Sequence, residues 1–122
     1  AYNFVCKCLV NMSGGEIFIP KLPSIKIIDL ANSLDNKIEK KIIGIQPGEK
    51  LHETMFTEMD CPNVIEFKDY FTIIPNINFF KKTKNFYINS NGERGKKLKE
   101  QRSYSSKDNT FLNLKDLKKF IS

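Results

Sequence analysis

Residues 41–55 read KIIGIQPGEKLHETM, and this stretch decides the expected fold. The apolar run at 42–45 is rich in β-branched isoleucine, which is typical of a buried strand. Pro47 and Gly48 end that strand, because proline fixes φ and withholds a hydrogen-bond donor. Residues 49–55 have a helix-forming composition. A strand, a sharp turn and a helix start predict an α/β unit with polar side chains at the end of a strand, where such proteins bind ligands.

The sequence before this stretch predicts a helix, a strand and a second helix. Apolar residues at helical spacing predict an amphipathic helix over 1–12. Residues 16–19 form a short strand that Pro20 closes. Ser24 is expected to cap a helix whose apolar stripe runs from Ile27 to Leu34.

The sequence after this stretch is less regular. Residues 64–67 and 70–74 are rich in β-forming side chains and predict a hairpin, whereas 76–91 is expected to be a loop. Asn113 is expected to cap a C-terminal helix. The element order predicts an α/β fold, or α+β for this stretch taken alone, with short strands, packed helices and no Rossmann half.

The length of 122 residues predicts one domain over 1–122 with a single core. Within it, 1–58 is expected to be the core α/β segment and 59–122 a C-terminal extension. Apolar residues make up 40% and charged residues 28%, which is ordinary for a globular protein. The sequence has no run of apolar residues long enough for a membrane span and no visible signal peptide, so we expect a cytoplasmic protein.

The formal charge of +6 comes from 20 basic and 14 acidic residues. The basic residues are spread along the chain without a nucleic-acid-binding motif, so we expect a solvated face or attraction to an anionic sugar nucleotide. Cys6, Cys8 and Cys61 have no partner at zinc-site spacing. The sequence therefore predicts reduced cysteines, no metal site and no nucleic-acid partner.

Three segments resemble one enzyme family. Residues 41–55 resemble the IRPGEKLHE segment of the extended short-chain dehydrogenases that act on UDP-N-acetylglucosamine, and 14–26, GGEIFIPKLPSIK, resemble their GGEIFVPKIPSMK segment. Residues 104–110, YSSKDNT, resemble their YSSxxN tail. The three matches occur in the family's order and cover about 3–121. The tail favours the inverting UDP-N-acetylglucosamine 4,6-dehydratases of polysaccharide biosynthesis.

This resemblance implies that the chain is the C-terminal, nucleotide-sugar-binding part of such a lyase. In that family, hydride leaves C4 of the sugar for NADP, water is lost, and hydride returns to C6. The product is a UDP-4-keto-6-deoxy-hexosamine for pseudaminic acid or surface polysaccharide. The implied partners are a UDP-sugar substrate, an N-terminal Rossmann part that binds NADP, and further copies in a homo-oligomer.

The chemistry of cofactor binding and catalysis is missing from this stretch. Its six glycines never form the GxGxxG turn that holds a dinucleotide pyrophosphate. No tyrosine is followed by lysine at the fourth position, which is the family's catalytic pair. We therefore expect no catalytic and no cofactor-binding residue here, and no activity from this stretch alone.

The resemblance implies eight substrate-binding residues: Pro20, Lys21, Gln46, Glu49, Tyr104, Ser105, Ser106 and Lys107. Pro20 and Lys21 resemble the strand edge beside the uridine, and the tail resembles a segment that closes over the substrate. Glu49 is expected to hold its loop or to contact a ribose hydroxyl. Gln46 replaces the family's phosphate-binding arginine, so a charge-assisted contact becomes a neutral one.

Two alternatives remain open at this point. A capsule-type dehydratase/5-epimerase, or another nucleotide-sugar dehydratase, shares the first two segments. A non-enzymatic module that holds a nucleotide sugar, or only packs against a partner, is consistent with the missing cofactor half. His52 is the only histidine and has no nucleophile or ligand cluster around it in the sequence, so we expect it to be structural.

Overall fold

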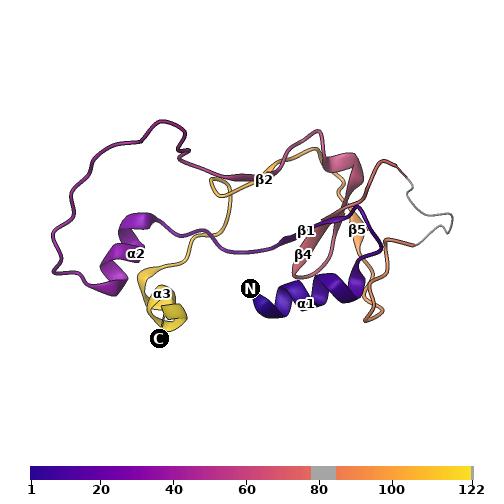
Figure 1. Cartoon of the computed structure of the whole chain (residues 1–122), viewed down its shortest axis with the longest axis horizontal. Helices are drawn as coiled ribbons and strands as arrows, with labels where there is room; N and C mark the ends of the chain where they lie inside the picture. The colour runs from indigo at the N-terminus through magenta and orange to yellow at the C-terminus, as the bar shows by residue number, and fades with distance from the viewer. Residues whose placement is uncertain (78–84, 122) are drawn as a thin grey trace. The chain divides into compact units, whose positions relative to one another are not determined.

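The computed structural model describes residues 1–77 and 85–121 (Figure 1). Part of the loop predicted over 76–91 lies outside these residues. The chain forms two compact units, each made of two separate segments. Unit 1 consists of Ala1–Lys21 and Met55–Ser103, and unit 2 of Leu22–Thr54 and Tyr104–Ser122. These units do not follow the predicted division at residue 58, and the single domain over 1–122 stays a prediction.

Unit 1 is built on a four-stranded antiparallel sheet in the order β1-β4-β3-β5. Its elements are α1 (Tyr2–Asn11), β1 (Ile17–Pro20), the 3-10 helix η1 (Cys61–Asn63), β3 (Val64–Glu66), β4 (Tyr70–Ile73) and β5 (Lys96–Lys97). In the register, Ile19 lies opposite Phe71, and Ile65 lies opposite both Thr72 and Lys97. The predicted first helix, first strand and hairpin are therefore confirmed.

The core of unit 1 centres on Ile65, Phe67 and Tyr70, which are buried. The rings of Phe67 and Tyr70 stack with their centroids 4.7 Å apart. Phe4 of α1 meets the Tyr70 ring edge-on at 6.2 Å, and Figure 1 shows α1 beside β1 and β4. Burial raises the pKa of Tyr70, because the phenolate form would lose its hydration.

Gly95 brings the chain close to this core just before β5. A Cβ added at Gly95 would lie against Cγ2 of Ile65 and 2.8 Å from Cζ of Phe67. The Gly95 N–H also donates to the carbonyl of Tyr87 at 2.9 Å. Glycine is therefore required here by the close approach of its backbone to two buried side chains.

Unit 2 contains α2 (Ile27–Leu34) and α3 (Leu114–Ile121), which pack against one another (Figure 1). Leu117 of α3 is buried. Asn113 caps α3, as predicted, because its Oδ1 accepts the N–H of Asp116 at 3.0 Å. The cap predicted at Ser24 is wrong: α2 begins after Lys26 without a side-chain cap, and the Ser24 hydroxyl bonds elsewhere.

The strand predicted at 42–45 and the helix predicted at 49–55 are both wrong. Residues 42–45 form no strand, and Ile42 is 91% exposed, because no described segment pairs with this run. After the turn at 47–48, the chain enters β2 (Thr54–Phe56), which pairs with β6 (Tyr104–Ser105) in a two-stranded sheet. Helices combined with small antiparallel sheets confirm the α+β form of the prediction.

We predict that Gly95→Ala lowers the free energy of unfolding by about 1–3 kcal/mol, because the new methyl group overpacks against Ile65 and Phe67. Urea unfolding followed by circular dichroism measures the change. Ser90→Ala, an exposed position near the same turn, is the matched control and should shift stability by less than about 0.5 kcal/mol. Equal stabilities of the Gly95→Ala variant and the unsubstituted protein would show that the core yields to the methyl group.

Candidate functional site

In unit 2, the segment after Lys21 is bonded to the YSSKDNT tail. The hydroxyl of Tyr104 donates to the carbonyl of Leu22 at 3.1 Å and accepts the Leu22 N–H at 3.2 Å. Nδ2 of Asn109 donates to the same carbonyl at 2.5 Å and to Oγ of Ser24 at 3.2 Å. Two tail side chains therefore fix the backbone of the segment that resembles PKIPS.

Ser24 extends this connection through its own backbone and hydroxyl. Its Oγ donates to the carbonyl of Ser106 at 2.9 Å, and its N–H donates to the carbonyl of Thr110 at 2.8 Å. The N–H of Leu112 donates to the carbonyl of Ser24 at 3.0 Å, and Ser24 forms a parallel β-bridge with Phe111. Backbone and side-chain hydrogen bonds therefore join Ser24 to the tail and to the residues that follow it, from Ser106 to Leu112.

Ser106 also joins the tail to the end of the QPGEKLHE stretch. Its N–H donates to the carbonyl of Glu53 at 2.9 Å, and its Oγ accepts the Glu53 N–H at 3.0 Å. Nδ1 of His52 lies 3.5 Å from the same Oγ. Ser106 therefore contacts both other motifs, through Ser24 on one side and Glu53 on the other.

The loop that contains Gln46 and Glu49 is held by its own residues. Oε2 of Glu49 accepts the N–H of Gln46 at 2.9 Å, and the N–H of Glu49 donates to the carbonyl of Gln46 at 3.0 Å. Gly48 in this turn has a φ of +90°, which favours glycine. The side chains of Gln46 and Glu49 are exposed, and the structure assigns Glu49 a role in closing the turn.

Lys21 and Pro20 belong to unit 1, where β1 ends. Nζ of Lys21 donates to Oε1 of Glu66 at 2.7 Å and lies 4.8 Å from the centre of the Phe71 ring. Nη2 of Arg102 is 3.8 Å from the same carboxylate oxygen. Glu66 is thus shared by two cations, and the positive charge of Lys21 is already paired.

The structure joins only part of the predicted set. Within unit 2, Tyr104 and Ser106 lie in one hydrogen-bonded network, while the N–H of Lys107 donates to Oγ of the buried Ser105 at 3.1 Å. Sequence reasoning missed Ser24 and Asn109 as members of this network. The signal was present for Asn109, since it is the last residue of the YSSxxN motif. The eight substrate-binding residues stay a prediction.

The glycine pair that follows α1 does not fit a dinucleotide pyrophosphate. The N–H groups of Ser13 and Gly14 donate to the two carboxylate oxygens of Glu16 at 2.8 and 2.6 Å. A phosphate at this turn would meet a carboxylate in place of free N–H donors. Among the described residues there is also no group of three or more metal-ligating side chains.

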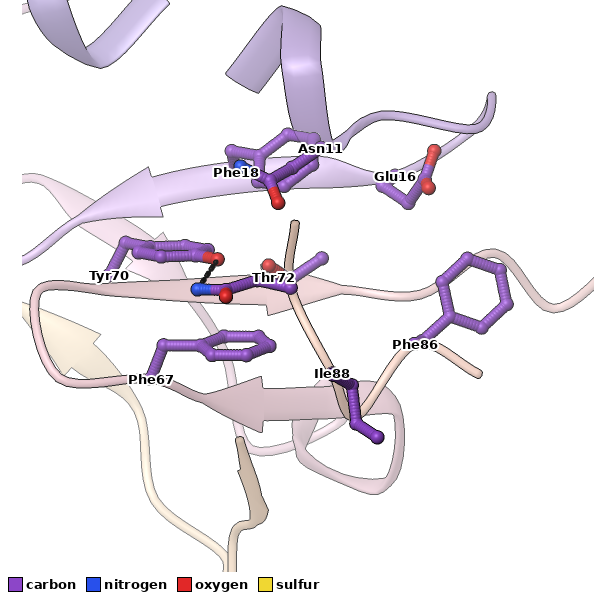
Figure 2. Close-up of a pocket in the computed structure, with 9 residues that line it drawn as sticks. Asn11, Glu16, Phe18, Phe67, Tyr70, Thr72, Phe86 and Ile88 are labelled. Atoms are coloured by element: carbon purple, nitrogen blue, oxygen red, sulfur yellow. Dashed lines mark hydrogen bonds between the residues drawn. The ribbon is translucent and has the colours of Figure 1, made fainter. Parts of the chain in front are cut away.

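A small hollow in unit 1, of about 20 Å³, lies between the sheet and the segment around Ile88 (Figure 2). Phe18, Phe67 and Tyr70 line it, and Nδ2 of Asn89 donates to the Tyr70 hydroxyl at 3.3 Å. A cavity of this size holds a single water molecule at most. It is a feature of core packing and too small for a sugar nucleotide.

Displaced pKa values among the described residues have structural causes. Burial raises the pKa of Cys8, opposed by the nearby charge of Lys7. The N–H and hydroxyl of Thr57 donate to the Asp60 carboxylate at 2.7 and 2.8 Å and lower its pKa. A lowered pKa means that ionised Asp60 stabilises the folded state at any pH above its unfolded-state pKa. This contribution is lost as the pH falls through the folded-state pKa.

A family model described as polysaccharide biosynthesis protein matches residues 1–75, which is more than half of the chain. The chain belongs to this polysaccharide biosynthesis protein family. In the part of the chain that the structure describes, no helix is both long enough and apolar enough to cross a membrane.

Two relatives are named UDP-N-acetylglucosamine 4,6-dehydratase (inverting). The protein of Campylobacter jejuni subsp. jejuni serotype O:2 is 50% identical over 107 residues, and that of serotype O:23/36 is 47% identical over 107 residues. Each match covers 88% of this chain and 32% of the relative. The chain therefore spans about a third of the length of the family members it matches.

A solved structure of Pen from Bacillus thuringiensis has a similar fold, with a TM-score of 0.71 and 24% sequence identity. The match covers 95% of this chain and 32% of that protein. At this identity the likeness concerns the fold alone.

We predict that Ser106→Ala speeds hydrogen exchange of the Glu53 amide by about twofold to tenfold, because this N–H loses its hydroxyl acceptor. Exchange followed by NMR at the Glu53 amide measures the effect. Ser103→Ala is the matched control, since Ser103 is exposed and close in the sequence. An unchanged Glu53 amide in the Ser106→Ala variant would contradict the role of Ser106 as the link between the two motifs.

Proposed function

We propose that this chain is the nucleotide-sugar-binding portion of a UDP-N-acetylglucosamine 4,6-dehydratase (inverting). The observation that carries the proposal is the 50% identity, over 88% of the chain, to a family member with that name. The hydrogen bonds between residues 22–24 and the YSSKDNT tail in unit 2 support it, because both belong to segments that resemble such enzymes.

The complete protein, in this proposal, is a cytoplasmic lyase that makes a UDP-4-keto-6-deoxy-hexosamine for pseudaminic acid or surface polysaccharide. A Rossmann part outside this chain binds NADP, which supplies the redox chemistry of the dehydration. Homo-oligomer formation is part of the same proposal. The glycine turn after α1 does not fit the pyrophosphate of NADP, and the proposal assigns no catalytic step to the residues of the present chain.

The task of this chain is to hold the UDP part of the substrate. Binding energy from the nucleotide orients the sugar toward catalytic groups that lie elsewhere in the protein. Lys21 supplies positive charge for a phosphate, after exchanging its contact with Glu66 for one with the ligand. The Lys21–Glu66 pair is partly exposed, with side chains 29% and 35% accessible, so this exchange costs little.

The tail residues supply hydroxyl groups and one further positive charge. Tyr104 and Ser106 are already held by bonds to Leu22 and Glu53, which lowers the entropy lost on binding. Lys107 is exposed and adds its charge beside these hydroxyl groups. The network thus gives the proposed site a preformed backbone on which the polar side chains are displayed.

We predict that Lys21→Ala combined with Ser105→Ala abolishes the weak binding of UDP by the 122-residue chain, because a charged and a hydroxyl contact are lost together. Isothermal titration calorimetry with UDP measures the affinity. Lys37→Ala combined with Ser103→Ala is the matched control at exposed positions. Circular dichroism checks that both variants are folded, and unaltered UDP binding by the folded test variant would refute the site.

We predict that Gln46→Arg strengthens UDP binding by about 1.5–3 kcal/mol, because a guanidinium makes a charge-assisted contact with phosphate where an amide makes a neutral one. The same titration measures the change. Asn36→Arg adds the same charge at another exposed position of unit 2 and should leave the affinity within about twofold. Equal gains in the two variants would mean that Gln46 does not face a phosphate.

A further inference from the structure

A hollow of about 270 Å³ lies in unit 1 beside β5 and the segment that follows it. It is lined by Glu66, residues 96–100 and Arg102. Lysine or arginine supplies four of the lining side chains, and glutamate supplies two. A concave surface with excess positive charge raises the local concentration of anions.

The carboxylate of Glu66 forms its ion pairs with Lys21 and Arg102, and with none of the lysines that line the hollow. It receives Nζ of Lys21 at 2.7 Å and has Nη2 of Arg102 at 3.8 Å. Lys96 of β5 lies opposite Glu66 of β3 in the register of the two strands. The ion pairs of Glu66 are nevertheless made with Lys21 and Arg102. Among the described residues, Lys96, Lys97 and Lys99 form no ion pair. Of the two carboxylates that line the hollow, Glu66 is paired and Glu100 has no ion pair with a described residue.

The segment 96–102, which carries the basic residues of the hollow, is fixed to the rest of unit 1 at both ends. At its start, Gly95 packs against Ile65 and Phe67, and β5 pairs with β3. At its end, the N–H of Arg102 donates to Sγ of Cys61 at 3.3 Å, and Sγ of the buried Cys61 lies 2.8 Å from the Arg102 carbonyl. Cations on a backbone fixed in this way lose less entropy when they bind a ligand.

The volume and the donor types indicate the class of ligand. Pockets for drug-sized molecules measure about 300–1,000 Å³, so this hollow suits a smaller group than a whole nucleotide sugar. Arg102 offers a planar fork of donors that matches two phosphate oxygens, and lysine ammonium groups add point charges around it. A small anion with several negative charges meets both requirements.

We propose that this hollow binds a small multivalent phosphate anion of the pyrophosphate class, held by Lys96, Lys99 and Arg102. None of the eight residues proposed for the nucleotide sugar lines it. The two proposals meet only at Glu66, because the inference uses the Lys21–Glu66 pair as it stands in the chain without UDP. The titration below is therefore made without UDP.

Isothermal titration calorimetry of the 122-residue chain with sodium pyrophosphate at low salt tests the proposal. The test variant carries Lys96→Gln, Lys99→Gln and Arg102→Gln, and we expect its Kd to rise by at least about tenfold. The matched control carries three equivalent charge losses at exposed positions of unit 2: Lys37→Gln, Lys41→Gln and Lys115→Gln. Its Kd should stay within about twofold of that of the unsubstituted chain.

Absence of pyrophosphate binding, or equal weakening in the two triple variants, would overturn the proposal. Circular dichroism shows whether the test variant is folded, and Lys99→Glu alone, which lies outside β5, serves if it is not. A parallel titration uses a single-stranded oligonucleotide. Binding of the oligonucleotide without binding of pyrophosphate would mean an extended polyanion surface and would likewise refute the small-anion site.

Discussion

The antiparallel pairing of β1 with β4 is the constraint on which unit 1 depends. It brings Ile17–Pro20 next to Tyr70–Ile73 across about fifty residues of chain. Side chains alternate between the two faces of the sheet, so one register decides both the aromatic core around Tyr70 and the position of the charged residues. A slip by one residue would move Phe71 from beneath Lys21 into the Tyr70 core.

Two kinds of polar arrangement are built on these units. In unit 2, neutral hydrogen bonds through Ser24, Ser106 and Asn109 join segments that are about eighty residues apart in the sequence. In unit 1, ionic contacts converge on Glu66, which is shared by Lys21 and Arg102. The first arrangement fixes the backbone and the second distributes charge, and the proposed binding of a nucleotide sugar requires both.

Sequence patterns predicted the elements whose stability is local or rests on the nearest strand. The helical spacing of 1–12, the hairpin at 64–74 and the Asn113 cap all carry their signals within a few residues. The strand at 42–45 failed because a strand needs a partner, which an apolar run does not specify. The expected helix at 49–55 failed because Glu53 pairs with Ser106, a contact that no local pattern contains.

The candidate site was predictable to a similar extent. The motif resemblance indicated the tail and the PKLPS segment, and residues 22–24 of that segment do form one network with the tail in unit 2. The engagement of Lys21 by Glu66 was not predictable, because the two residues meet only through the order of the strands. The basic hollow likewise depends on the way Gly95 and Cys61 anchor the segment between them.

The exposed isoleucines at 42–45 have a consequence for the behaviour of the protein in solution. A short exposed apolar run that pairs with no strand of the described residues favours β-pairing between molecules, which leads to aggregation. Lys40 and Lys41 precede this run and Lys50 follows it, so like charges meet whenever two copies align in parallel. Colloidal stability of this chain should therefore decline as added salt screens these lysines.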